Sequence, residues 1–109
     1  MLEPLLGSKN AEKVLIYIRA FDEGYAREIS RFFNTALTPV QNQLDKFEAG
    51  GILVSSLKGR TRIYTFSPRY PFLKELLGLL DKAISFYPEG ERERLLMTRR
   101  RPRRTGKTL

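Results

Sequence analysis

The sequence contains no cysteine, no histidine and no tryptophan among its 109 residues. Without cysteine the chain cannot form a disulfide, which fits a reducing compartment such as the cytoplasm. Without cysteine and histidine it also lacks the ligands that soft metal ions prefer, the usual general bases of enzymes and thiol nucleophiles. We therefore expect no metal, no cofactor and no enzymatic activity.

Long apolar stretches and a glycine-rich phosphate-binding loop are absent as well. No apolar run approaches the roughly 20 residues that are needed to cross a bilayer. The first residues, Met1-Leu2-Glu3-Pro4, are acidic and interrupted by proline, so they do not look like a secretion signal. The sequence therefore predicts a cytoplasmic protein without membrane association, whose chemistry is recognition rather than catalysis.

Positive charge is concentrated at one end of the chain. Lysine and arginine number 20 against 12 acidic residues, which gives a formal net charge of +8. Up to Met97 the cations number 14 against the same 12 acids, so the body is nearly neutral and the end is cationic. This distribution predicts a polyanionic partner, although a solvated terminus without a role is the alternative. We expect phosphate contacts from the cations of this tail, Arg99, Arg100, Arg101, Arg103, Arg104 and Lys107.

Apolar periodicity predicts three helices in the first half of the chain, over residues 9–21, 26–34 and 38–49. Ser8 is the expected N-cap of the first helix, and Asn34 suits the left-handed end of the second. The third helix has the sharpest signal, because Thr38, Pro39 and Gln41 form a capping box with Thr38 as the N-cap. Gly50-Gly51 ends this helix.

After Gly51 the spacing of the apolar residues changes from that of a helix to that of a strand. Two β-rich runs, residues 52–57 and 62–66, flank a glycine-containing loop over residues 58–61, which predicts a β-hairpin. A long helix follows over residues 71–87, and Pro88 begins a last helix with glutamates in its first turn and arginines at its end. The predicted order is helix, helix, helix, strand, strand, helix, helix.

The second and third helices are joined by a tight connection, which is typical of a helix-turn-helix. Val40, Leu44 and Phe47 cluster on one side of the third helix, so its opposite arc faces outward. Glutamine and asparagine can pair with adenine, lysine can reach guanine or phosphate, and a helix N-terminus favours phosphate. An ordinary amphipathic surface helix is the alternative. We predict DNA contacts from the outer arc, Thr38, Gln41, Asn42, Asp45 and Lys46.

The predicted hairpin is rich in cations, and no acid occurs between Ala49 and Glu75. A hairpin directly after the third helix can lay its tip along the DNA backbone or into the minor groove, where arginine is favoured. Protection of an exposed strand edge also uses cations, but it does not explain the preceding helix pair. We expect the hairpin to contact DNA through Lys58, Arg60, Thr61 and Arg62.

Six segments carry a likeness to a known family: GSK (7–9), YAREI (25–29), LTPVQ (37–41), LDKFEAGGIL (44–53), GRTRIY (59–64) and PFLKEL (71–76). Together they resemble the ArsR/MarR-type winged helix-turn-helix superfamily of prokaryotic transcriptional regulators. Within it they are most similar to the small winged-helix domains associated with minimal nucleotidyltransferases. The resemblance implies a winged-helix fold, a dimer and DNA binding. Asn34 and Thr35 depart from the pattern, which favours glycine and an apolar residue, so a looser turn is expected there.

The long helix is apolar on more than one face. One face can cover the domain and the other needs a partner, because the last helix offers little apolar area. We therefore predict a homodimer that presents two recognition helices to half-sites about one DNA turn apart. The predicted interface consists of Leu73, Leu76, Leu77, Leu80, Ile84 and Tyr87.

The sequence thus predicts an α+β, mostly α, winged helix-turn-helix with a three-helix core, a β-hairpin wing and a C-terminal dimerisation helix. The expected divisions are a DNA-binding domain over residues 1–87, a short terminal helix over 88–98 and a basic, disordered tail over 99–109. Sequence-specific binding of double-stranded DNA by a prokaryotic transcriptional regulator is the predicted function. The alternatives are a protein-interaction module, for example a partner of a nucleotidyltransferase, and a non-specific nucleic-acid binder. A positive stripe joining Lys46, Arg60 and Arg62 would favour DNA, whereas an apolar outer face would favour a protein partner.

Overall fold

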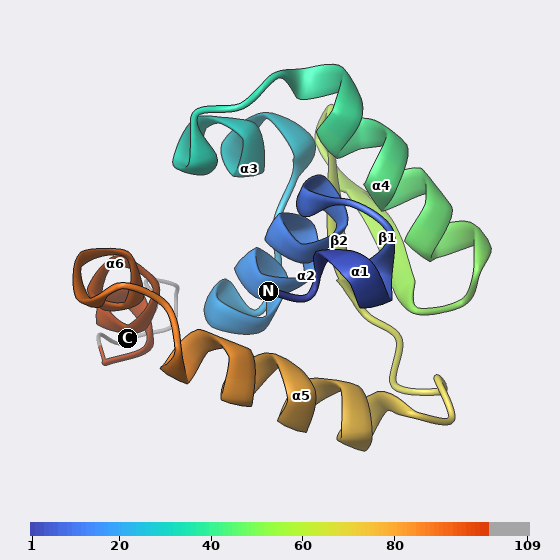
Figure 1. The fold of residues 1–109 in the computed structure, drawn as a ribbon. Coiled ribbons are helices and arrows are strands. Elements are labelled where there is room, and N and C mark those ends of the chain that lie inside the picture. The colour runs from blue at the N-terminus through green and yellow to red at the C-terminus, as the bar shows by residue number, and fades with distance from the viewer. Residues whose placement is uncertain (101–109) are drawn as a thin grey trace.

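The structure is a computed structural model that describes residues 1–100, with the backbone alone for 97–100. The predicted order of elements is confirmed, with one additional short helix at the start (Figure 1). The elements are α1 (Glu3–Leu6), α2 (Lys9–Phe21), α3 (Ala26–Phe33), α4 (Leu37–Ala49), β1 (Leu53–Lys58), β2 (Thr61–Phe66), α5 (Leu73–Ser85) and α6 (Glu89–Arg100). A helix pair followed by an antiparallel hairpin and two further helices confirms the mostly helical α+β winged helix-turn-helix.

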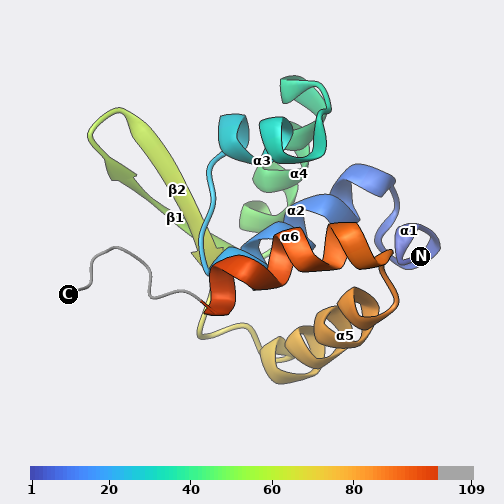
Figure 2. The same cartoon turned by 90° about the vertical axis from the view of Figure 1, so that its left-hand side faces the viewer.

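Helix α2 is the centre of the molecule. Nine of its 13 residues are buried, on all sides of the helix, because α1, α3, α4, α5, α6 and β2 all pack against it. Ser8 caps the helix as predicted, since its hydroxyl accepts a hydrogen bond of 3.0 Å from the Ala11 N–H. Helices α5 and α6 pack on α2 away from the hairpin tip (Figure 2).

The pair α3 and α4 forms the helix-turn-helix. The predicted inner face of α4 is confirmed, because Val40, Leu44 and Phe47 are its buried residues. Asn34 ends α3 with a φ of 53°, the left-handed conformation that was predicted for it. Its neighbour Thr35 donates a backbone hydrogen bond of 2.9 Å to the Ser30 carbonyl, which closes the turn.

The predicted capping box at the start of α4 is wrong. The helix begins at Leu37, Ala36 is its N-cap, and no side chain caps it. Pro39 is therefore the third helical residue, where its missing N–H costs nothing because the first N–H groups of a helix have no intrahelical partner. Thr38 lies exposed in the first turn. Gln41 takes no part in a cap and donates a hydrogen bond to the Tyr64 hydroxyl instead.

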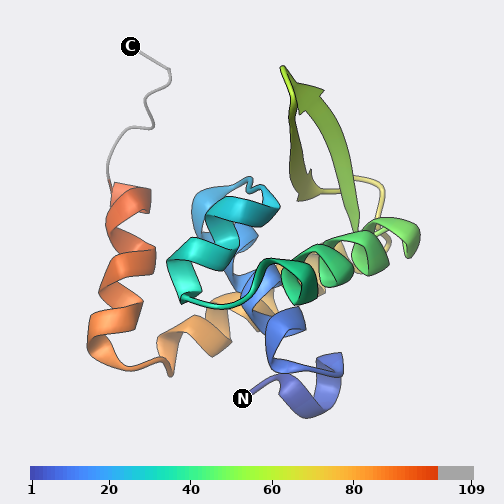
Figure 3. The same ribbon diagram turned by 90° about the horizontal axis from the view of Figure 1, so that it is seen from above.

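The hairpin stands away from the helical body (Figure 3). Lys58 pairs with Thr61 across the end of the two strands, so the turn contains only Gly59 and Arg60. Gly59 has a φ of 65°, which glycine adopts at little cost, and glycine at the first position is typical of a type II′ turn. At the base, Gly24 and Tyr64 exchange two backbone hydrogen bonds, so the hairpin is anchored to the segment between α2 and α3.

The last two helices pack on the core more fully than the sequence predicted. Helix α5 is shorter than expected and buries Leu80, Ala83 and Ile84 within the chain itself. Arg19 of α2 and Asp81 of α5 form an ion pair with two hydrogen bonds, of 2.7 and 2.8 Å. These contacts correct the predicted dimer surface, because Leu80 and Ile84 have no surface left for a second copy.

Helix α6 covers the remaining side of α2. Leu95 is fully buried, and the Arg94 guanidinium lies 4.0 Å over the ring of Phe32 in α3. The α6 backbone continues to Arg100, so Arg99 and Arg100 belong to a helix and not to the tail that was predicted from residue 99. The remaining predicted tail cations, Arg101, Arg103, Arg104 and Lys107, lie outside the described residues.

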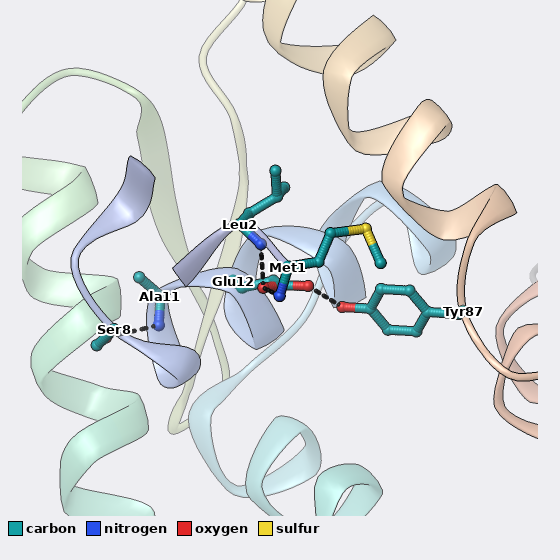
Figure 4. A network of polar contacts seen from close by, with 6 residues as sticks. All are labelled: Met1, Leu2, Ser8, Ala11, Glu12 and Tyr87. Carbon is teal, nitrogen blue, oxygen red and sulfur yellow. Dashed lines mark hydrogen bonds and ion pairs between the residues drawn. The ribbon is translucent and has the colours of Figure 1, made fainter. Parts of the chain in front are cut away.

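A buried carboxylate, Glu12, lies where α2 meets the N-terminal segment and the end of α5 (Figure 4). It accepts hydrogen bonds from the Leu2 N–H, at 2.7 Å, and from the Tyr87 hydroxyl, and the amino group of Met1 lies 3.3 Å away. Burial alone would raise the pKa of Glu12, but these hydrogen bonds and the nearby positive charge together lower it. Burial raises the pKa of the Tyr87 phenol, and its bond to Glu12 raises that pKa further.

Candidate nucleic-acid interface

A groove of about 450 Å³ separates α4 from the hairpin. Its walls are one side of α4 with Leu37, Gln41, Asp45 and Glu48, the start of α3 with Tyr25, Ala26 and Arg27, and the hairpin with Arg60, Thr61, Arg62 and Tyr64. Five of the nine predicted DNA-binding residues of the body therefore line one groove. Both signs of charge face it, with two carboxylates on α4 and three arginines on the opposite walls.

Gln41 connects the two walls of this groove. Its Nε2 donates one hydrogen bond of 2.9 Å to Asp45 Oδ1 and another of 3.2 Å to the Tyr64 hydroxyl. The Tyr64 residue is only 2% exposed, and this burial raises the pKa of its phenol despite the bond from Gln41. The phenol therefore stays protonated near neutral pH, so the Tyr64 hydroxyl is not ionised where Gln41 bonds to it.

The three hairpin cations have different surroundings. Arg62 NH1 donates a hydrogen bond of 3.0 Å to Ser55 Oγ, and Ser55 Oγ donates one of 2.6 Å to Glu48 Oε2. Lys58 Nζ lies 3.8 Å from Glu23 Oε1 in an exposed ion pair. Arg60, at the turn, is exposed and has no charged partner among the described residues. Arg62 thus braces the hairpin against α4, while Arg60 is available to an anion.

The other predicted contacts of α4 lie outside the groove. Thr38 and Asn42 are exposed on the outer arc of the helix. Lys46 turns toward α1, where its Nζ lies 3.4 Å from the Leu6 carbonyl oxygen and 5.0 Å from the centre of the Phe47 ring. Asp45 and Glu48 line the groove together with the hairpin arginines, whereas Lys46 does not line it, so the groove carries mixed charge instead of the predicted positive stripe. The outer arc is nevertheless polar rather than apolar.

Sequence reasoning missed Tyr25, Arg27 and Tyr64 as groove residues. Tyr64 was expected to be only a strand residue, and its phenol reaches Gln41 of α4 although β1 is the strand that packs on this helix. Arg27 carried a weak signal, since it is a cation in the first turn of the first helix of a helix-turn-helix. That position faces the groove only because α3 begins beside β2.

The apolar residues of α5 divide into two groups. Leu76 and Leu79 of α5, and Tyr87 just after it, are partly buried against the core; Leu76 and Tyr87 belong to the predicted interface. Leu73 and Leu77 are half-buried but do not belong to the core cluster. Among the described residues no helix is long and apolar enough to span a membrane, and no cluster of three or more metal-binding side chains occurs.

Comparison with protein-family models gave no match, and neither did comparison with curated proteins. A solved structure of a ZitR mutant from Lactococcus lactis, in its apo form, is similar to this chain with a TM-score of 0.55 and 18% sequence identity. The match covers 74% of this chain and 64% of the ZitR chain, so this chain spans less than two thirds of that structure's length. At such low identity the likeness shows the fold alone, and it confirms the winged helix-turn-helix architecture.

Proposed function

We propose that this protein binds double-stranded DNA in a sequence-specific manner, as a prokaryotic transcriptional regulator. Helix α4 would enter the major groove, and the hairpin would lie on the backbone or in the minor groove. The observation that carries this proposal is the groove between them, which brings polar side chains of α4 and hairpin arginines to one surface. The winged-helix fold supports the same geometry, although a fold does not by itself determine function.

The roles of the residues follow from their exposure. Thr38, Asn42 and Asp45 are exposed on the outer arc of α4, where they can reach base edges. Arg60 at the hairpin tip and Arg27 in the first turn of α3 are suited to phosphates on either side. Lys46 has contacts with α1, so we place it at the margin of the interface.

Binding rather than catalysis is the proposed activity of this groove. Its two carboxylates already have partners, since Asp45 accepts from Gln41 and Glu48 accepts from Ser55.

We further propose that two copies of the chain associate through the edge of α5 that carries Leu73 and Leu77. These leucines are half-buried without belonging to the core, so a second copy could cover them. A two-fold dimer would place two α4 helices on half-sites about one turn of DNA apart.

The direct test is selection of binding sites from random duplex DNA with the full chain. We expect enrichment of one motif with two related half-sites whose centres are about 10 base pairs apart. A parallel selection from single-stranded DNA controls for charge alone, because phosphate attraction does not require a duplex. Failure to retain any duplex at low salt would contradict the proposed function.

A further inference from the structure

We propose that Gln41 and Asp45 act as a joint hydrogen-bond acceptor that selects cytosine in the major groove. This inference rests on the proposed function, because it assumes that α4 meets base edges. It differs from the prediction made from the sequence, in which Gln41 pairs with adenine.

The orientation of the Gln41 amide is determined by its neighbour. An ionised carboxylate has no hydrogen to donate, so the amide nitrogen and not the oxygen must face Asp45. The second amide hydrogen is used by the Tyr64 hydroxyl. Both donors of Gln41 are therefore engaged inside the protein, and no described residue donates a hydrogen bond to its Oε1.

The polar atoms of Gln41 and Asp45 that remain for DNA accept hydrogen bonds and cannot donate them. They are Gln41 Oε1 and the carboxylate oxygens of Asp45, which is exposed. In the major groove guanine presents N7 and O6 and thymine presents O4, all of them acceptors. Adenine presents an amino group, but its N7 acceptor lies beside that group. Cytosine presents the N4 amino group with no acceptor next to it on the same base, so it fits best.

The cost of a carboxylate near DNA is offset within the same groove. Arg60 and Arg27 line its other walls, so phosphates on either side of the selected base would meet positive charge. Asp45 thus contributes selectivity while the arginines contribute attraction, which agrees with the general division between base and phosphate contacts.

The test compares Asp45→Ala with Glu48→Ala in binding-site selection and in titrations of single-base variants of the selected site. Asp45→Ala frees one amide hydrogen of Gln41, which can then pair with adenine in the usual bidentate way. We expect the wild type to prefer cytosine about tenfold at one position of each half-site, and Asp45→Ala to prefer adenine there. Glu48→Ala removes the same charge one turn further on, but its carboxylate is bonded to Ser55 and not to Gln41, so cytosine should remain selected.

Three outcomes would overturn the inference while leaving DNA binding intact. Asp45→Ala could retain the wild-type preference at every position, so that the pair reads no base. Glu48→Ala could change the preference in the same way, so that charge rather than hydrogen bonding decides. The wild-type motif could also lack cytosine at the position that Asp45→Ala alters. A wild type that retains no duplex contradicts the proposed function itself, and this result is visible before any variant is compared.

Discussion

A carboxylate inside a protein is costly unless its oxygens accept hydrogen bonds, and Glu12 meets that condition with partners from two distant parts of the chain. Leu2 contributes a backbone N–H and Tyr87 contributes a hydroxyl, although 75 residues separate Glu12 from Tyr87. The pKa of Glu12 is lowered as a result, so the ionised form is stabilised in the folded state. The carboxylate therefore joins the N-terminal segment, α2 and the end of α5.

We expect Tyr87→Phe to lower the free energy of unfolding by about 1–3 kcal/mol at neutral pH, because a buried carboxylate loses a donor. Because the pKa of Glu12 is lowered in the folded state, its carboxylate stabilises the fold at pH values above its ordinary pKa of 4.5. This stabilisation is lost as the pH falls through the lowered pKa. The difference between wild type and variant should therefore shrink on acidification. Urea unfolding at several pH values measures it, and Tyr70→Phe is the control. A difference that is independent of pH would assign the loss to packing.

The Gln41 side chain shows what a sequence can and cannot predict about a single residue. Its place on the outer arc of α4 followed from apolar periodicity, but its exposure is intermediate, unlike that of Thr38 and Asn42. Its hydrogen-bond partner Tyr64 lies 23 residues away and reaches it only through the tertiary fold. Local pattern therefore predicted the position of Gln41, whereas its chemistry required the tertiary contact with Tyr64 of β2.

The elements whose apolar residues recur at a regular spacing were predicted well. The bounds of α2, the inner face of α4 and the hairpin all agree with the sequence analysis, because regularly spaced apolar residues must be buried in each. The start of α4 was misplaced because the backbone turn after Asn34 brings Ala36 into the N-cap position, where no side chain is required. The role of α6 was underestimated, since Leu95 is fully buried, Leu96 packs against the core, and Arg94 both stacks on Phe32 and donates a hydrogen bond to its carbonyl.

The hairpin as an element is predicted to position the protein on DNA rather than to read sequence. Arg60→Ala combined with Arg62→Ala should weaken binding to all duplexes at low salt and leave the selected motif unchanged, because phosphate contacts carry no sequence information. Titration of the selected site and of random DNA at two salt concentrations measures both effects.

The matched control is Arg69→Ala, an exposed arginine in the connection between β2 and α5, at the base of the hairpin rather than its tip. Since Arg62 also braces the hairpin through Ser55, thermal unfolding of the double variant must show that the fold is retained. Unchanged affinity in a folded double variant would exclude the hairpin from the interface.

At the scale of the whole molecule, the structure sharpens the proposal of a dimer. Leu77→Asp should give a folded monomer, because this leucine is half-buried outside the core, whereas Leu80→Asp should unfold the chain, because Leu80 is fully buried. Sedimentation at micromolar concentration distinguishes these results. Ser85→Asp, on the exposed side of α5, should leave the assembly unchanged. Wild-type protein that sediments as a monomer would refute the premise.

The charge distribution of the whole chain leads to a last prediction. Deleting residues 101–109 keeps the α6 backbone and removes four cations, Arg101, Arg103, Arg104 and Lys107. Each phosphate that a protein neutralises contributes about −0.9 to the slope of log K against log salt on duplex DNA. If half of these cations contact phosphates, the deletion should flatten the slope by about 2 per protomer.

Specific and random DNA should weaken together in the truncated protein, so the ratio of the two affinities should hardly change, because phosphates are present in every sequence. Titrations of full-length and truncated protein at several salt concentrations measure the slope and the ratio in one experiment. An unchanged slope would indicate that the tail does not contact DNA, and would favour an acidic protein as its partner. A truncated protein that loses its sequence preference would place base reading in the tail, as occurs in arms that enter the minor groove, and would limit the groove beside α4 to a supporting role.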